Sequence, residues 1–105
     1  MQKFTIGYES GSGGYNTMSY LDIKPNNPHN EIEIVLMLED GTSFNKSVSK
    51  NTVIETNSDD KEYPFMILKI NNDQIHRQKY YYKNISIVIT GDCSVEKKMA
   101  MDYDR

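Results

Sequence analysis

Two histidines and one cysteine are the residues of this chain that could form a zinc site or act as base and nucleophile: His29, His76 and Cys93. A zinc site needs several such side chains at spacings that let them converge, and these three are far apart in the sequence. Cys93 follows the predicted end of a strand without a catalytic signature, which favours a small buried residue over a nucleophile paired with His76. We therefore predict no metal site, no cofactor and no enzymatic activity, with His76 on a partly exposed strand face.

A group of carboxylates between residues 55 and 62 has ligand types that suit calcium. It consists of Glu55, Asp59, Asp60 and Glu62. The group lacks the alternating oxygen ligands and the fixed glycine of an EF-hand loop. We interpret it as part of a solvated loop.

The glycine-rich stretch YESGSGGYN, residues 8–16, could expose successive backbone N–H groups to an anion. The P-loop and the dinucleotide-binding fingerprint both need a helix after the glycines, whereas the residues that follow here have extended character. No lysine follows the glycines either. The stretch is then a long hairpin loop between Tyr8 and Tyr15, and its Tyr, Ser, Gly and Asn content is typical of recognition loops.

A second tyrosine-rich patch lies at residues 76–82. In an extended strand, alternate side chains share a face, which would place Tyr80 and Tyr82 together and Tyr81 opposite. One interpretation is a binding surface, and the other is a set of amphipathic strand residues encoded by an AT-rich gene. On the first interpretation, the predicted partner-binding residues are Tyr8, Tyr15, His76, Gln78, Tyr80 and Tyr82.

The composition favours strands over helices as the elements that position these residues. Eleven Ile and eight Tyr stand against one Ala and four Leu. Ile and Tyr suit a pleated, half-buried surface, whereas Ala and Leu are the strongest helix formers. An all-β domain is the expected fold class.

The clearest element is a hairpin over residues 31–48. Ile32, Ile34, Leu36 and Leu38 share one face, and Asp40-Gly41 predicts a type I′ turn with a return strand at residues 42–48 carrying Phe44 and Val48 inward. Val35 and Met37 occupy the other face. Their apolar character predicts a central strand that is covered on both sides toward its end.

Further strands are expected at residues 3–8, 17–23, 51–56, 63–70, 74–83 and 84–90. This predicts an antiparallel β-sandwich or partly open barrel of seven to eight strands within a single domain of residues 1–92. Pro64 belongs at a strand start or on an edge, because proline cannot donate to a sheet ladder. Residues 93–105 are expected to be a disordered tail or a short C-terminal helix, and a docked helix would cover Val35 and Met37.

Charge and cysteine content narrow the class of protein. The formal charge of −3, with both signs interleaved, argues against nucleic-acid binding, which needs a concentrated positive face. The single cysteine excludes an internal disulfide and indicates a reducing compartment. The sequence shows neither a signal peptide nor a membrane span, so we predict a cytoplasmic protein, in the host cytoplasm if a phage encodes it.

These features lead to two main hypotheses of function. The first is a small protein-binding module that occupies a surface of a larger partner, such as a phage or mobile-element inhibitor of the anti-CRISPR or another anti-defence type. The second is a β domain that stacks a nucleotide, a sugar or single-stranded nucleic acid on its tyrosines. A third hypothesis, a phage structural or assembly protein, would involve self-association into homo-oligomers.

Overall fold

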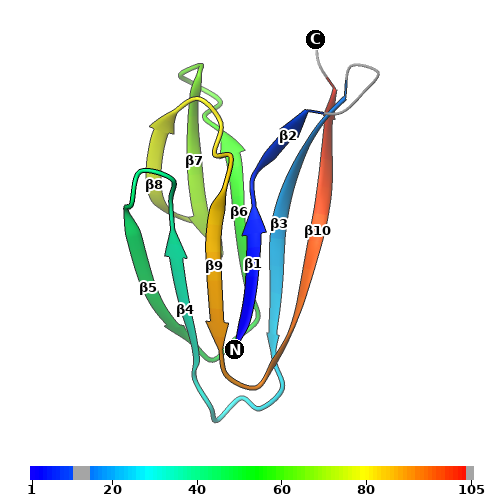
Figure 1. The fold of residues 1–105 in the computed structure, drawn as a ribbon, viewed down its shortest axis with the longest axis vertical. Helices are drawn as coiled ribbons and strands as arrows, with labels where there is room; N and C mark the ends of the chain where they lie inside the picture. The colour runs from blue at the N-terminus through cyan, green and yellow to red at the C-terminus, as the bar shows by residue number, and fades with distance from the viewer. Residues whose placement is uncertain (11–14, 104–105) are drawn as a thin grey trace.

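The computed structural model describes residues 1–10 and 15–103. These residues form two antiparallel sheets packed on one another, which confirms the predicted all-β sandwich (Figure 1). The four-stranded sheet has the order β1 (Gln2–Ile6), β9 (Ile85–Thr90), β4 (Ile32–Met37) and β5 (Ser43–Val48). The six-stranded sheet has the order β10 (Cys93–Tyr103), β3 (Tyr15–Pro25), β6 (Thr52–Ser58), β7 (Phe65–Ile70) and β8 (Asp73–Lys79), and β2 (Tyr8–Ser10) also pairs with β3.

The core lies between the sheets and consists mainly of isoleucine and leucine at alternate strand positions. Ile34 and Leu36 of β4 are fully buried, as are Ile87 and Ile89 of β9. Leu68 of β7 faces them from the six-stranded sheet. Because strand side chains alternate between the two faces, this period-two pattern fixes which face each sheet turns inward.

The predicted hairpin is present, but its turn differs from the prediction. β4 and β5 pair in register, and the connection contains three residues, Glu39–Gly41, instead of two. The Gly41 N–H donates to the Leu38 carbonyl at 3.0 Å, and only Gly41 within the loop has a positive φ, of 90°. A type I turn followed by a left-handed glycine is the usual three-residue hairpin, whereas a type I′ turn would need a positive φ at Asp40 as well.

The outer face of β4 also corrects a prediction. β4 is a central strand, between β9 and β5, as expected. Its outward side chains are nevertheless open to solvent, with Val35 38% and Met37 50% exposed. The central position comes from hydrogen-bonded neighbours within the sheet and not from a layer over both faces.

The C-terminal segment is neither a helix nor disordered through residue 103. β10 pairs with β3 over eleven consecutive residues, from Cys93 opposite Pro25 to Tyr103 opposite Tyr15. A run of only eight helix-tolerant residues is too short to hold a helix on its own, so pairing with a long neighbouring strand decides its structure. The extra strand, together with a break at Gly7 that divides residues 2–10, raises the number of strands above the predicted seven to eight.

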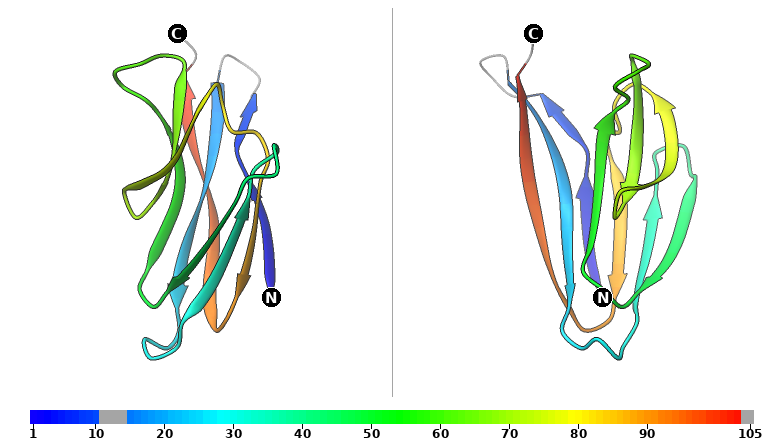
Figure 2. Two further views of the ribbon diagram at one scale, coloured as in Figure 1. Left: turned by 90° about the vertical axis from the view of Figure 1, so that its left-hand side faces the viewer. Right: turned by 180° about the vertical axis from the view of Figure 1, so that it is seen from behind.

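Gly7 is the corner at which the chain passes from one sheet to the other. β1 pairs with β9 in the four-stranded sheet, and β2 pairs with β3 in the six-stranded sheet. The right-hand view of Figure 2 shows β2, β3 and β10 diverging from β6 and β7 of the same sheet toward this end of the molecule, since β3 pairs with β6 only over Leu21–Ile23. The buried hydroxyl of Ser19 accepts the Gly7 N–H at 2.8 Å and donates to the Gly7 carbonyl at 3.2 Å.

In the described part of the chain, no helix has the length and apolar character needed to cross a membrane.

Candidate functional site

The tyrosine-rich stretch does not form the continuous strand face that its alternation predicts. β8 ends at Lys79, and Tyr80 has a left-handed backbone with φ of 69°. β8 also carries an irregularity, since its register against β7 shifts between Leu68 and Lys69. Alternation is therefore lost, and the side chains that follow point in different directions.

Each of the three consecutive tyrosines has a different environment. Tyr80 is 63% exposed, and the Lys79 ammonium lies 5.7 Å from its ring centroid. Tyr81 is half-buried and stacks on Tyr8 with 4.0 Å between the ring centroids. Tyr82 is buried in the core. Only Tyr80 of the three presents a largely open ring to a partner.

Tyr82 has a structural partner in His76. The Tyr82 hydroxyl and His76 Nδ1 are hydrogen-bonded at 2.8 Å, and the imidazole also contacts the edge of Phe44. This corrects one prediction, because Tyr82 is buried and cannot reach a partner without leaving the core. His76 lies partly exposed in β8, as predicted, with its imidazole engaged by Tyr82. Gln78 is engaged locally as well, since its side-chain amide donates to the carbonyls of Tyr80 and Tyr81.

Burial raises the pKa of the Tyr82 phenol, and the negative charge of Asp40 adds to the effect. The neutral phenol is therefore favoured by folding, and this contribution is complete below the unfolded pKa of about 10 and is lost as the pH rises from there toward the folded pKa. We expect Tyr82→Phe to cost about 1 kcal/mol at neutral pH, from the lost hydrogen bond, and to weaken the alkaline loss of stability. Urea unfolding at neutral and alkaline pH measures both effects. Tyr80→Phe is the control, and an unchanged alkaline dependence in Tyr82→Phe would contradict the prediction.

A second exposed tyrosine, Tyr63, lies in a loop whose backbone is hydrogen-bonded to that of Tyr80. Tyr63 is 89% exposed in the loop of residues 59–64 between β6 and β7. The Tyr80 N–H donates to the Pro64 carbonyl at 2.9 Å, which joins this loop to the segment after β8. We call the two segments, residues 59–64 and 80–84, together with Tyr8, the tyrosine end of the sandwich (Figure 1).

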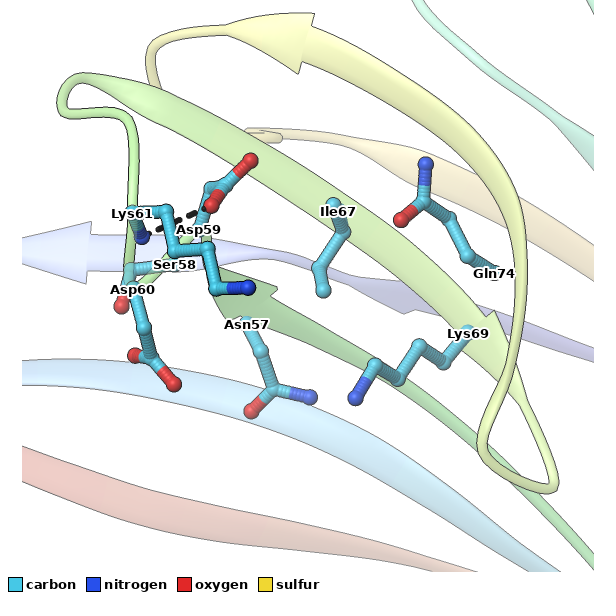
Figure 3. A pocket seen from close by; sticks show the side chains of 8 residues that line it. All are labelled: Asn57, Ser58, Asp59, Asp60, Lys61, Ile67, Lys69 and Gln74. Carbon is cyan, nitrogen blue, oxygen red and sulfur yellow. Dashed lines mark hydrogen bonds between the residues drawn. The ribbon is translucent and has the colours of Figure 1, made fainter.

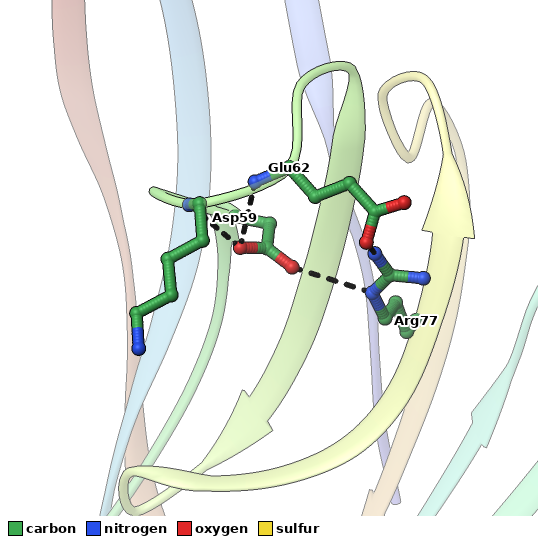
Figure 4. Close-up of polar contacts among 4 residues, drawn as sticks. Asp59, Glu62 and Arg77 are labelled. Carbon is green, nitrogen blue, oxygen red and sulfur yellow. Dashed lines mark hydrogen bonds and ion pairs between the residues drawn. The ribbon is translucent and has the colours of Figure 1, made fainter.

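The loop of residues 59–64 is held by Asp59 and Arg77. Asp59 Oδ1 accepts the backbone N–H groups of Lys61 and Glu62, which fixes the turn. The Arg77 guanidinium bridges Asp59 and Glu62 (Figure 4). It also lies 3.7 Å from the Phe65 ring centroid. The pKa of Asp59 is lowered mainly because it accepts the Lys61 N–H, and Arg77 adds to the effect. The loop therefore presents Tyr63 from an ordered backbone.

A polar cavity lies on the outer face of the six-stranded sheet, beside this loop. Its volume is about 440 Å³, and Ile67 lies among Asn57, Lys61, Lys69 and Gln74, whose polar groups surround it (Figure 3). Such a cavity can hold a small polar ligand by hydrogen bonds. Its lining residues include no aromatic ring, so it offers no platform for stacking a base or a sugar.

The residues considered for catalysis or metal binding are not brought together. Cys93 begins β10 and His76 lies in β8, and these strands form opposite edges of the six-stranded sheet. His29 lies in the connection between β3 and β4. Burial raises the pKa of the Cys93 thiol, which disfavours the reactive thiolate. Within residues 1–10 and 15–103, no group of three or more His, Cys, Asp or Glu side chains is placed to hold a metal ion.

Some of the predicted site lies outside the described residues. This applies to the glycines at positions 11, 13 and 14, and Tyr15 is described only as the first backbone position of β3. Tyr63 was missed by sequence reasoning, because nothing in the polar loop before Pro64 indicates which way a single aromatic side chain points.

A comparison of the chain with protein-family models, curated proteins and solved structures gives no significant match.

Proposed function

We propose that this protein is a protein-binding module that covers part of the surface of a larger partner with its tyrosine end. The observation that carries the proposal is the pair of exposed rings, Tyr63 and Tyr80, on two loops joined by a backbone hydrogen bond. Tyrosine contributes a large contact area at low entropic cost, and aromatic anchors supply much of the binding energy of interfaces.

The order of the supporting loop adds to this proposal. A binding loop that is already fixed loses less conformational freedom when a partner docks. The bridge from Arg77 to Asp59 and Glu62 and the turn at Asp59 supply that order here. Arg77 is thereby engaged with carboxylates, which leaves the tyrosine end less suited to a polyanion.

An inhibitory role is the finer form of the proposal. A module that binds by surface contact acts by blocking whatever its partner would otherwise bind. The small size of the protein and an amino-acid composition that indicates an AT-rich gene are typical of inhibitors from phages and mobile elements, including anti-CRISPR proteins. The alternative of stacking a base or sugar on a tyrosine row has less support, because Tyr80 and Tyr82 do not share a face and Tyr82 is buried.

The test is affinity capture from a lysate of the source cell or its host. We expect the double variant Tyr63→Ala/Tyr80→Ala to recover at least tenfold less partner than the wild type while its melting temperature stays nearly unchanged, because both rings are exposed. The matched control is Val35→Ala/Met37→Ala, which removes exposed apolar groups from the outer face of the four-stranded sheet. Loss of capture in the control, with full capture in the tyrosine variant, would place the interface elsewhere and refute the proposal.

A further inference from the structure

β10 leaves a long sheet edge open within the described part of the chain. It pairs with β3 on one side, and in Figures 1 and 2 no strand lies along its other side. Its eleven residues are about twice the usual strand length and contain neither a proline nor a register shift. Proteins usually protect an edge by shortening, bending or interrupting it, because unpaired backbone groups accept another strand.

The side chains of this edge are complementary to themselves. In an antiparallel pair of two β10 strands related by a twofold axis at Lys97, Glu96 of one copy lies opposite Lys98 of the other, and this happens twice by symmetry. The same register sets Val95 opposite Met99. Met99 is 48% exposed, so the pairing would cover an apolar side chain that the monomer leaves open.

Two features of the edge oppose this pairing, and neither prevents it. Lys97 would face its own copy across the axis, but its side chain is long and exposed and can turn away. Lys98 already bridges Asp22 at 3.3 Å and approaches Glu96 of its own strand. Its remaining donors can still reach a carboxylate on the neighbouring copy, since an ammonium has three.

We infer that the protein forms a symmetric dimer by antiparallel pairing of β10 with β10 of a second copy, which makes one continuous sheet of two six-stranded sheets. The inference goes beyond the proposed function and does not depend on it. The dimer would carry two tyrosine ends. A partner that presents two or more identical binding sites could then be bound at two of them at once, with a gain in avidity.

Charge exchange tests the register. Sedimentation over a dilution series is expected to show a dimer for the wild type and a dissociation constant raised roughly tenfold for Glu96→Lys, which replaces two opposite-charge pairs with two like-charge pairs. Lys98→Glu should do the same, and the double variant Glu96→Lys/Lys98→Glu should restore the dimer. Glu96→Lys is the safer single variant for folding, because position 96 lies opposite Asp22 within the chain.

Disulfide crosslinking tests the same register without relying on charge. In a Cys93→Ser background, which removes the native thiol, Lys97→Cys is expected to form a disulfide dimer under mild oxidation, because directly opposed Cβ atoms lie within bonding range. Ser94→Cys in that background is the control, since the two copies of position 94 would be about 20 Å apart. A monomeric wild type, a dimer that both single charge variants leave intact, or equal crosslinking at positions 94 and 97 would overturn the inference.

Discussion

Replacing Gly7 with alanine is expected to lower the free energy of unfolding by about 3 kcal/mol or more. A Cβ at this position would lie 2.0 Å from the Lys83 carbonyl oxygen and 2.5 Å from the carbonyl carbon. Both atoms belong to the backbone, so no side-chain rotation relieves the overlap. The backbone φ of 155° adds strain for any residue with a side chain.

The cost is large because two structural functions meet at Gly7. The chain changes sheets there, and the segment that includes Tyr82 and Lys83 runs directly against it. The neighbouring Tyr8 N–H donates to the Tyr82 carbonyl at 2.8 Å. Pushing residues 82–83 away would therefore break this hydrogen bond and move the tyrosine end as well as the core.

Equilibrium unfolding in urea measures the effect, and Gly41→Ala is the matched control. Gly41 also has a positive φ, of 90°, but a Cβ there meets no atom within 4 Å. Only the backbone strain remains, so we expect a cost of about 1 kcal/mol. If Gly7→Ala unfolds at the same urea concentration as the wild type, or if Gly41→Ala is the more destabilised of the two, the close approach at Gly7 is wrong.

The hydrophobic alternation of the sequence predicts the sandwich well because burial on one sheet face imposes a period of two. Ile32, Ile34 and Leu36 are assigned correctly to the core on that basis. The same pattern cannot report what lies on the opposite face. Val35 and Met37 are apolar, and only the structure shows that both side chains are exposed.

The C-terminal strand could not be predicted, because its structure depends on a partner distant in the sequence. Residues 94–101 have weak helix character, but β3 offers a long edge for pairing some seventy to eighty residues earlier. Pairing along that edge outweighs local propensity. The end of β8 could not be predicted either. The left-handed backbone at Tyr80 ends this strand, although the alternation of side chains in the sequence continues past it.

The candidate site was predicted only in part for the same reason. Tyrosine is amphipathic, so its presence in a strand or loop does not distinguish an exposed ring from a buried one. Tyr80 is exposed as the binding hypothesis requires, whereas Tyr82 is buried against His76. Arg77 holds the loop of residues 59–64 through carboxylates fifteen and eighteen residues earlier in the sequence. No local sequence pattern predicts such an ion pair.

Truncating Leu36 to alanine is expected to cost about 2 to 5 kcal/mol, whereas truncating the adjacent Val35 costs less than about 1 kcal/mol. Leu36 is fully buried between its strand neighbours Ile87 and Phe44, so its removal leaves a cavity in the core. Val35 lies on the open face of the same strand, and its loss removes only surface contacts such as that with Val88.

Because the two residues are neighbours on one strand, backbone position and sheet order are the same for both variants. The difference in unfolding free energy therefore reports which face of the four-stranded sheet is buried. Urea unfolding at several protein concentrations gives that difference and separates folding from association, since only a dimer makes the midpoint depend on concentration. Equal costs for the two truncations would mean that the outer face is covered in solution, and the exposure of Val35 and Met37 would have to be abandoned.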